Sequence, residues 1–262
     1  MHSVKCNYPA TWDHANVYIL SDLHIGDPKC DMDDVNRQIK QVEEDPCGLC
    51  VLNGDLMNTA TRSGISDIYS ETLPPMEQLQ RVIELLTPIK DKIIGVTSGN
   101  HEDRVWNNDG VDITRFMCQQ FKIEDRYDPD GVVIFLRFGT KNSHAQKRTV
   151  KTGWTYSIYM THGRGGGRKE GAKAIRLADM ASTVDTDIYI HSHTHLPMIM
   201  STGFYRIHES QKSIEKVDKL FVNSSGSLEY GGYSQKNEFK PAAIRHPIIH
   251  LAGGRKLARA TL

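Results

Sequence analysis

Five short apolar runs in this chain each end in a cluster of aspartate, asparagine or histidine side chains. The run at residues 17–20 is followed by Ser-Asp-Leu-His, and the run at 49–52 by Asn-Gly-Asp. The later runs are followed by Gly-Asn-His-Glu, Thr-His-Gly and His-Ser-His-Thr-His. Because loops at the carboxyl ends of strands form the binding crevice of open α/β sheets, we expect these distant clusters to meet at one edge.

The apolar runs alternate with helix-like stretches in the first half of the chain, and strands dominate the second half. The runs are rich in β-branched and aromatic residues and are bounded by polar or glycine-containing loops, which predicts strands. Amphipathic periodicity predicts helices at residues 33–44, 76–86, 113–121 and 172–181. This mixture predicts an α/β (α+β) fold with two packed mixed β-sheets flanked by helices.

Length and composition favour one domain over residues 1–262. With 39% hydrophobic and 24% charged residues, a chain of 262 residues can bury a core without disulfides or structural metals. Residues 139–152 are predicted to form a basic hairpin or loop, and residues 209–218 a mixed-charge connection between strands. Residues 253–262 are predicted to be a short, frayed C-terminal tail.

The charge balance argues against a protein that coats long nucleic acid. Lysine plus arginine equals aspartate plus glutamate, 32 each, whereas proteins that coat long nucleic acid usually have a basic excess. The five cysteines are an odd number at irregular spacing, and no secretory leader is expected, because the first residues have no apolar core of the kind a signal peptide needs. These features favour reduced thiols and a cytoplasmic location. No apolar run approaches the ~20 residues of a membrane span, so no membrane partner is expected.

The residue types in the five clusters are those that bind divalent metal ions. Carboxylate, imidazole and amide oxygen together suit hard-to-borderline ions such as Mn²⁺, Fe²⁺ or Zn²⁺. In Asp22-x-His24 and His193-x-His195, an extended segment with a side-chain period of 2 would point both residues of each pair to one side. A glycine in each of the second and third clusters lets the backbone turn sharply, so that the ligand faces inward.

The order of these clusters resembles that of the calcineurin-like metallophosphoesterases. The resemblance implies a four-layer sandwich of two β-sheets flanked by helices, with two divalent metal ions at its edge. One ion would be bound by Asp22, His24, Asp55 and His195. The other would be bound by Asp55, Asn100, His162 and His193, with Asp55 bridging the two. Mn²⁺ is the expected cofactor, with Fe, Zn or Ni as alternatives.

The same resemblance places His101 beside the substrate as the phosphate-contacting histidine and general acid. Two cations ~3.5–4 Å apart would clamp the attacking and leaving oxygens of an in-line displacement at phosphorus. A water that bridges them would be acidified toward neutrality and would attack as hydroxide. His101 would protonate the leaving alkoxide, because imidazole titrates near physiological pH.

Two positions depart from the family pattern. Ser192 stands where many members have a glycine before the first histidine of the last cluster, and this change leaves both ligands in place. Asn58 stands where many members have an acidic residue that orients His101. Its side chain can accept a hydrogen bond but would raise the basicity of His101 less than a carboxylate. The segment Asn58-Thr59-Ala60 also replaces the Asp-Arg-Gly of protein Ser/Thr phosphatases, which counts against that branch.

Three arginines are candidate substrate contacts. A glycine-rich loop that contains Arg164 and Arg168 begins directly after His162. Its backbone N–H groups and guanidinium donors would cradle a phosphate, or it would simply connect to the following helix. Arg104, three residues past His101, is either another phosphate contact or an ordinary cation on a helix surface.

These features predict a two-metal phosphodiesterase acting on a nucleotide, a cyclic nucleotide or a nucleic-acid end. The neutral net charge favours a small substrate or a strand end over long duplex. A phosphomonoesterase, including a nucleotidase, is the alternative. A third hypothesis is a phosphoesterase fold retained as an interaction scaffold, although such scaffolds usually lose metal ligands. The sequence does not indicate an oligomeric state.

Overall fold

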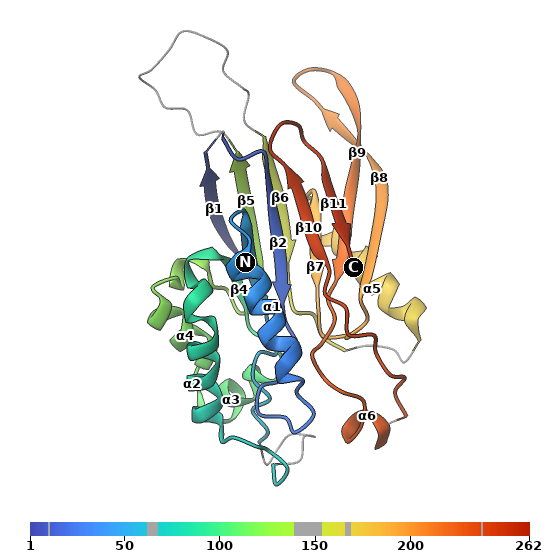
Figure 1. Cartoon of the computed structure of the whole chain (residues 1–262). Coiled ribbons are helices and arrows are strands. Elements are labelled where there is room, and N and C mark those ends of the chain that lie inside the picture. The colour runs from blue at the N-terminus through green and yellow to red at the C-terminus, as the bar shows by residue number, and fades with distance from the viewer. Residues whose placement is uncertain (10, 62–67, 139–153, 166–168, 237) are drawn as a thin grey trace.

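Two β-sheets pack face to face in the computed structural model of this protein, which describes residues 1–9, 11–61, 68–138, 154–165, 169–236 and 238–262 (Figure 1). Within these residues, one sheet has six strands and the other has five. Both sheets are mixed, because each contains parallel and antiparallel neighbours. The basic segment predicted at residues 139–152 lies outside the described residues.

The strands of each sheet come from both halves of the chain. In spatial order, the six-stranded sheet contains β1 (His2–Tyr8), β5 (Val132–Phe138), β6 (Thr155–Met160), β7 (Ile188–His191), β9 (Ser213–Asn223) and β8 (Met198–His208). The five-stranded sheet contains β11 (Ala258–Thr261), β10 (Ile248–Ala252), β2 (His14–Leu20), β3 (Gly48–Asn53) and β4 (Ile93–Thr97).

Strand β3 shows how the sequence sets the layers. Leu49 and Val51 face the core between the two sheets, whereas Cys50 and Leu52 face the helices on the other side. Successive side chains of a strand point to opposite faces, so a strand covered on both faces reads as a continuous apolar run. The uninterrupted run at residues 49–52 is therefore the signature of a central strand.

Helices cover the outer face of each sheet. The first group packs on the five-stranded sheet and consists of α1 (Met32–Glu44), α2 (Pro75–Leu86) and α4 (Ile113–Phe121). On the six-stranded sheet, α5 (Glu170–Thr183) packs Leu177 against Tyr189 and Phe221. The predicted four-layer α/β sandwich is therefore confirmed. The other helices are α3 (Glu102–Asp109), α6 (Tyr233–Lys236) and two 3-10 segments, Thr87–Lys92 and Glu124–Arg126.

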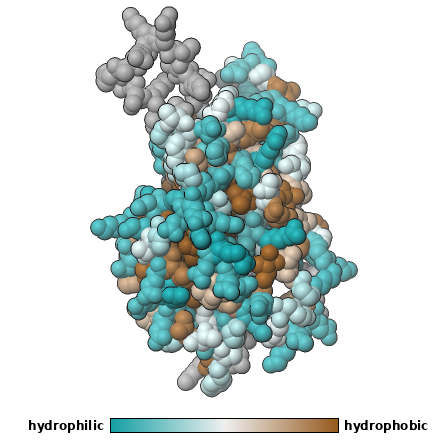
Figure 2. All heavy atoms as spheres, in the orientation of Figure 1, coloured by the Kyte–Doolittle hydropathy of each residue, from teal (hydrophilic) through white to brown (hydrophobic). Residues whose placement is uncertain are grey.

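The helical surface is polar, as amphipathic helices require. Figure 2 shows mostly hydrophilic residues over the face that carries α1 and α2 in Figure 1. Among the described helices, none has both the length and the apolar character needed to cross a bilayer.

One local prediction was wrong, and another was correct only in part. Ala258–Thr261 does not fray but forms β11, antiparallel to β10, with Ala258 and Ala260 packed against the core between the sheets. Residues 209–218 contain the predicted connection between two strands, but it is shorter: all of β8 pairs with all of β9, so the connection is limited to residues 209–212 and residues 213–218 belong to β9. In both places, strand pairing extends through residues whose polar or small side chains gave no strand signal.

Asp34 of α1 ties this helix to the loop that follows β9. Its carboxylate is 3% exposed and accepts hydrogen bonds from Ser227 Oγ at 2.8 Å, Gln38 Nε2 at 3.0 Å and His246 Nε2 at 2.7 Å. The backbone N–H of Ser227 donates to the backbone oxygen of Asp22 at 3.0 Å. Through these contacts α1 supports the segment that follows β2.

The substitution Asp34→Ala is expected to lower the free energy of unfolding by about 2 kcal/mol, because it removes the acceptor of several buried donors. Asp33→Ala is the matched control, since Asp33 lies in the same first turn of α1 but is exposed. Urea unfolding of the two variants measures the difference. Equal losses of stability would contradict the role given to the buried contacts of Asp34.

The contribution of Asp34 is also expected to depend on pH. Burial raises the pKa of Asp34, but hydrogen bonding to His246 and the charge of that ring outweigh burial and hold the pKa below its ordinary value. Such a group stabilises the fold above its ordinary pKa of ~4 and loses that contribution as pH falls through the folded pKa. The difference in unfolding free energy between wild type and Asp34→Asn should therefore shrink as pH falls below about 4. Urea titrations across this range would refute the idea if the difference stayed constant.

Candidate metal centre

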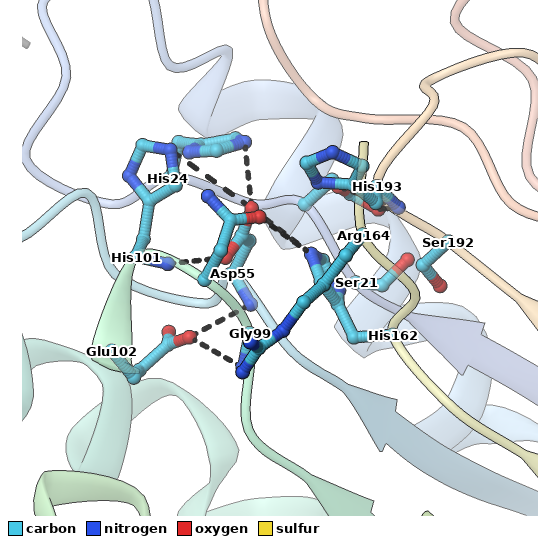
Figure 3. A network of polar contacts seen from close by, with 12 residues as sticks. Ser21, His24, Asp55, Gly99, His101, Glu102, His162, Arg164, Ser192 and His193 are labelled. Atoms are coloured by element: carbon cyan, nitrogen blue, oxygen red, sulfur yellow. Dashed lines mark hydrogen bonds and ion pairs between the residues drawn. The ribbon is translucent and has the colours of Figure 1, made fainter. Parts of the chain in front are cut away.

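The polar clusters predicted from the sequence meet at one end of the sheets. β2, β3 and β4 are parallel neighbours in one sheet, and β6 and β7 are parallel neighbours in the other. Each cluster directly follows the carboxyl end of one of these five strands. Figure 3 shows His24, His101, His162 and His193 gathered near Asp55.

Tight loops, and not extended strand ends, bring these side chains together. Five of the predicted ligands have a backbone φ in the left-handed region: Asp22 (52°), His24 (50°), Asp55 (51°), His193 (65°) and His195 (52°). Residues other than glycine rarely adopt such angles, and those that do cluster at functional sites. The expectation of extended Asp-x-His and His-x-His segments was therefore wrong, because β2 ends at Leu20 and β7 at His191.

The two predicted glycines act in different ways. Gly54 has a φ of 77°, the sharp turn that the sequence suggested. At Gly99 the constraint is space, because an added Cβ would lie 2.2 Å from the backbone nitrogen and Oδ1 of Asp55. The loops after β3 and β4 therefore approach each other more closely than any side chain at residue 99 would allow.

The first ligand group contains Asp22, His24 and His195, whose ligand atoms all lie within 4.8 Å of one another. His195 Nε2 is 3.1 Å from Asp22 Oδ1 and 3.3 Å from His24 Nε2. The backbone N–H of His193 donates to Asp22 Oδ1 at 3.1 Å. Within the described residues, the buried Nδ1 of His24 has no hydrogen-bond partner. Two imidazole nitrogens beside one carboxylate are a donor set for a cation.

The second ligand group contains Asp55, His162 and His193, again with ligand atoms within 4.8 Å of one another. Asp55 Oδ2 is 3.1 Å from His162 Nε2, which in turn is 3.3 Å from Asn100 Oδ1. His162 Nδ1 donates to the backbone oxygen of Asn53 at 2.7 Å, which leaves Nε2 toward the site. Asp55 Oδ2 is also 4.0 Å from His24 Nε2. Asp55, a member of the second group, therefore also lies next to the first group.

Asp22 and Asp55 are charged although they are 0% and 1% exposed. Burial raises the pKa of both carboxyl groups, but nearby histidines, His195 and His162 respectively, outweigh it and hold both pKa values well below the usual range. Among the described residues, neither aspartate forms an ion pair with lysine or arginine. Buried carboxylates are unfavourable unless cations or hydrogen bonds compensate their charge.

The histidines complete a donor set that fits divalent cations. Burial lowers the pKa of His24 well below its ordinary value and lowers the pKa of His193 to about 4. Both rings are therefore neutral near pH 7 and have a lone pair available for a metal ion. Carboxylate, neutral imidazole and the amide oxygen of Asn100 are together the ligands of borderline divalent ions.

His101 lies beside both groups, at the N-cap of α3. Its Nε2 is 3.9 Å from Asp55 Oδ2. Its Nδ1 donates to the backbone oxygen of Asn58 at 2.6 Å, and its Nε2 accepts from Arg104 Nη2 at 3.0 Å. Since a carbonyl only accepts and a guanidinium only donates, the ring is neutral with its proton on Nδ1. Burial, aided by the charge of Arg104, lowers the pKa of His101 accordingly.

The contact predicted for the side chain of Asn58 comes instead from its main chain. Asn58 Nδ2 donates to Glu71 Oε1, away from His101. The next residue, Thr59, has a φ of 39°, and its hydroxyl donates to the backbone oxygen of His101. This turn directs the backbone carbonyl of Asn58 toward the imidazole of His101. The direction of a backbone carbonyl cannot be predicted from the residue type at position 58.

Glu102 is a site residue that was missed in the sequence. Its carboxylate is 3% exposed and accepts the backbone N–H groups of Asp55 and Met57 at 2.9 Å and of Gly99 at 3.0 Å. Burial raises its pKa to about 7. It therefore fastens the loop after β3 to the loop after β4 (Figure 3). Its place directly after Asn100 and His101, at the start of a helix, was the available signal.

The predicted substrate arginines have different surroundings. Arg164, drawn in Figure 3, has a side chain that is 78% exposed and donates from Nη2 to Asp103 Oδ2 at 2.8 Å. Arg104 donates to His101 and, at 3.5 Å, to the backbone oxygen of Asn58. Arg168 lies outside the described residues. Arg104, a residue of α3, therefore contacts His101 directly, and Arg164 contacts α3 through Asp103.

Comparison with known proteins gives one match by sequence family. Residues 15–197 match the family model of the calcineurin-like phosphoesterases, and no match was found among curated proteins. Similar solved structures include a predicted phosphoesterase from Streptococcus pneumoniae, 13% identical, with a TM-score of 0.38, covering 96% of this chain and 99% of the other. A metallophosphoesterase from Sphaerobacter thermophilus is 12% identical, with a TM-score of 0.39 and coverages of 95% and 88%. The nuclease MPE from Pseudomonas putida is 12% identical, with a TM-score of 0.36 and coverages of 94% and 87%.

Binding of Mn²⁺ is expected to stabilise the fold. A ligand that binds only the folded state at 100 times its Kd adds ~2.7 kcal/mol, which raises the thermal midpoint of a protein of this size by roughly 5–10 °C. Asp55→Ala removes the carboxylate of the second group, which also lies beside His24 of the first, and should abolish most of the shift, whereas Asp33→Ala should keep it. Thermal melts after chelation, with and without Mn²⁺, measure the effect. A full shift in Asp55→Ala would contradict the central place of Asp55.

Proposed function

This chain belongs to the calcineurin-like phosphoesterase family, and we propose that it hydrolyses phosphodiester bonds in nucleotides, cyclic nucleotides or nucleic-acid ends with the help of two divalent metal ions. The observation that carries the proposal is the meeting of two Asp/His ligand groups around Asp55, with His101 beside both. A site that only stabilised the fold would have no use for the neighbouring histidine and arginine.

The two ions would share Asp55. The first would be bound by Asp22, His24, Asp55 and His195. The second would be bound by Asp55, Asn100, His162 and His193. We propose Mn²⁺, with Fe, Zn or Ni as alternatives, because the donors are a mixture of oxygen and imidazole nitrogen. When bound, such ions would lower the pKa of a water molecule and offset the charge on the phosphoryl oxygens.

His101 would supply the proton of the leaving group from Nε2 as an imidazolium, because in the neutral ring the only proton is the one on Nδ1. The carbonyl of Asn58 holds the proton on Nδ1 and thereby fixes the ring with Nε2 toward Asp55. Arg104 donates to Nε2 in the structure. A phosphoryl oxygen would be a better acceptor for this guanidinium, because charge-assisted hydrogen bonds are stronger than neutral ones. Binding of substrate would then draw Arg104 to the phosphate and leave Nε2 able to take up a proton from solvent. The ring would pass this proton to the leaving oxygen and return to its neutral form with Nδ1 protonated.

The charge around the site favours a diester over a monoester. A phosphodiester carries one negative charge near pH 7, whereas a monoester carries close to two. Arg164 already forms an ion pair with Asp103, and Arg104 already donates to His101 and Asn58. Because the ion pair with Asp103 offsets the charge of Arg164, this arginine adds little net positive charge to the site, which supports the singly charged substrate. A phosphomonoesterase remains the alternative function.

Two further proposals concern the chain as a whole. We propose that residues 1–262 act as one domain, since one hydrophobic cluster joins both sheets from β1 to β11. We also propose a reducing, cytoplasmic location, which the five unpaired cysteines support.

With Mn²⁺, the protein is expected to hydrolyse bis-p-nitrophenyl phosphate faster than p-nitrophenyl phosphate. Asp55→Asn should abolish both activities, and His101→Ala should lower kcat by about 10²–10⁴ for substrates with poor leaving groups. Steady-state kinetics in chelated and Mn²⁺-loaded samples measure these rates. Hydrolysis of the monoester alone would replace this proposal with the alternative. No hydrolysis of any ester, with no effect of either variant, would favour the scaffold hypothesis.

Arg164 is expected to bind the substrate and not to take part in proton transfer. Arg164→Ala should raise KM for a dinucleotide by about tenfold, the value of one charge-assisted hydrogen bond, with kcat nearly unchanged. Arg81→Ala, an exposed arginine of α2 that also pairs with an acidic residue, is the control. A fall in kcat with unchanged KM would show that Arg164 acts in the chemical step instead.

A further inference from the structure

Glu71 lies outside every predicted motif but contacts the turn that orients His101. It belongs to the segment before α2, and its half-buried carboxylate accepts hydrogen bonds from Asn58 Nδ2 and Gln78 Nε2. The backbone N–H of Ala60 donates to it as well. The carboxylate of Glu71 therefore accepts hydrogen bonds from three donors that belong to two different segments of the chain.

Gln78 of α2 completes this arrangement. Its side chain is 0% exposed, its Nε2 also donates to the backbone oxygen of Leu73 at 2.7 Å, and its Oε1 accepts the N–H of Thr59 at 2.9 Å. Glu71 and Gln78 together contact each residue of the turn Asn58-Thr59-Ala60. The two side chains form a clamp on that turn.

The turn needs such a clamp because its conformation is strained. Thr59 has a φ of 39°, which is unfavourable for a β-branched residue. The N–H of Asn58 donates to the backbone oxygen of Ile25 at 3.0 Å, so the start of the turn is fixed by the loop after β2. The direction of the Asn58 carbonyl then depends on how Thr59 and Ala60 are held, which is the contribution of Glu71 and Gln78.

We propose that Glu71 is a positioning residue for His101: it holds the Asn58 turn so that the main-chain carbonyl fixes the imidazole with Nε2 toward the ligand groups. This inference deepens the proposed function and rests on it for its catalytic consequence. A carboxylate suits the role because all three of its partners are donors, whereas a glutamine would turn its own N–H₂ group toward one of them. Within the described residues, the hydrogen bonds of Glu71 go to Asn58, Ala60 and Gln78 and not to a residue of the ligand groups.

The position of the His101 ring can be measured without activity. Nitrogen-detected NMR of histidine-labelled protein reports which ring nitrogen carries the proton, with His101→Gln to assign the signal. Wild type is expected to show His101 protonated on Nδ1. Glu71→Ala and Asn58→Ala should both produce a mixture of tautomers, and Glu71→Gln a smaller change. Glu77→Ala, an exposed glutamate in the first turn of α2, should leave the signal unchanged.

Kinetics with two leaving groups test the catalytic consequence. An aryl diester such as bis-p-nitrophenyl phosphate needs little protonation of its leaving group, whereas a dinucleoside phosphate releases a sugar alkoxide that needs a proton. Glu71→Ala should lower kcat for the dinucleoside phosphate at least about tenfold and kcat for the aryl diester less than about twofold. In a His101→Ala background, Glu71→Ala should have no further effect on either substrate.

The outcomes separate this inference from the proposed function. An unchanged His101 signal in both Glu71→Ala and Asn58→Ala would overturn it, as would an equal loss of kcat for both esters in Glu71→Ala. A changed signal in a protein that hydrolyses neither ester would keep the positioning role and reject the proposed function. Thermal melts identify any variant that fails to fold, and Glu71→Gln, which keeps an acceptor, then takes the place of Glu71→Ala.

Discussion

The burial of two charged carboxylates, Asp22 and Asp55, is the constraint on which the rest of this site depends. Moving a carboxylate out of water is strongly unfavourable unless cations and hydrogen bonds replace its hydration. Here the partners come from loops that follow strands of both sheets. In this sandwich, parallel strands of both sheets end at a common edge, and this brings the loops within reach of each other. The stability of the buried carboxylates in this chain therefore depends on the packing of the two sheets that positions their partners.

The cost of crowding the loops is offset by buried polar contacts between them. Left-handed φ angles at non-glycine residues cost on the order of 1 kcal/mol or more each, and five of the proposed ligands have them. Asn53 at the end of β3 donates to the backbone oxygen of Thr161 at 3.0 Å and to Ser192 Oγ at 2.6 Å, and accepts from Thr97 Oγ1 at 2.8 Å. One amide thus joins the ends of four strands. Many family members have glycine at the position of Ser192. The serine hydroxyl accepts the hydrogen bond from Asn53, a contact that glycine could not make.

The sequence predicted those parts of the fold that are buried on two faces or strongly amphipathic. The run at residues 49–52 reads as a central strand, and the helix predicted at residues 113–121 has the bounds observed for α4. β1 and β11 were missed because they are edge strands, and an edge strand with one exposed face contains polar residues such as Lys5 and Arg259. α3 was missed because most of its residues are polar and Glu102 alone is buried. For edge strands and short polar helices, pairing and packing outweigh local preference.

In the candidate site, residue type predicted which side chains lie close together but not how His101 is oriented. The proximity of these side chains was predictable, because each polar cluster followed a recognisable strand. The orientation of His101 was not, because its acceptor is a main-chain carbonyl whose direction is set by the φ of Thr59 and by Glu71 and Gln78, residues far along the chain. Every residue type has such a carbonyl, so position 58 can change from an acid to asparagine while an acceptor still faces the imidazole. The asparagine at position 58 therefore changes which group accepts the hydrogen bond from His101: a main-chain carbonyl takes the place of a side-chain carboxylate. The imidazole still has an acceptor.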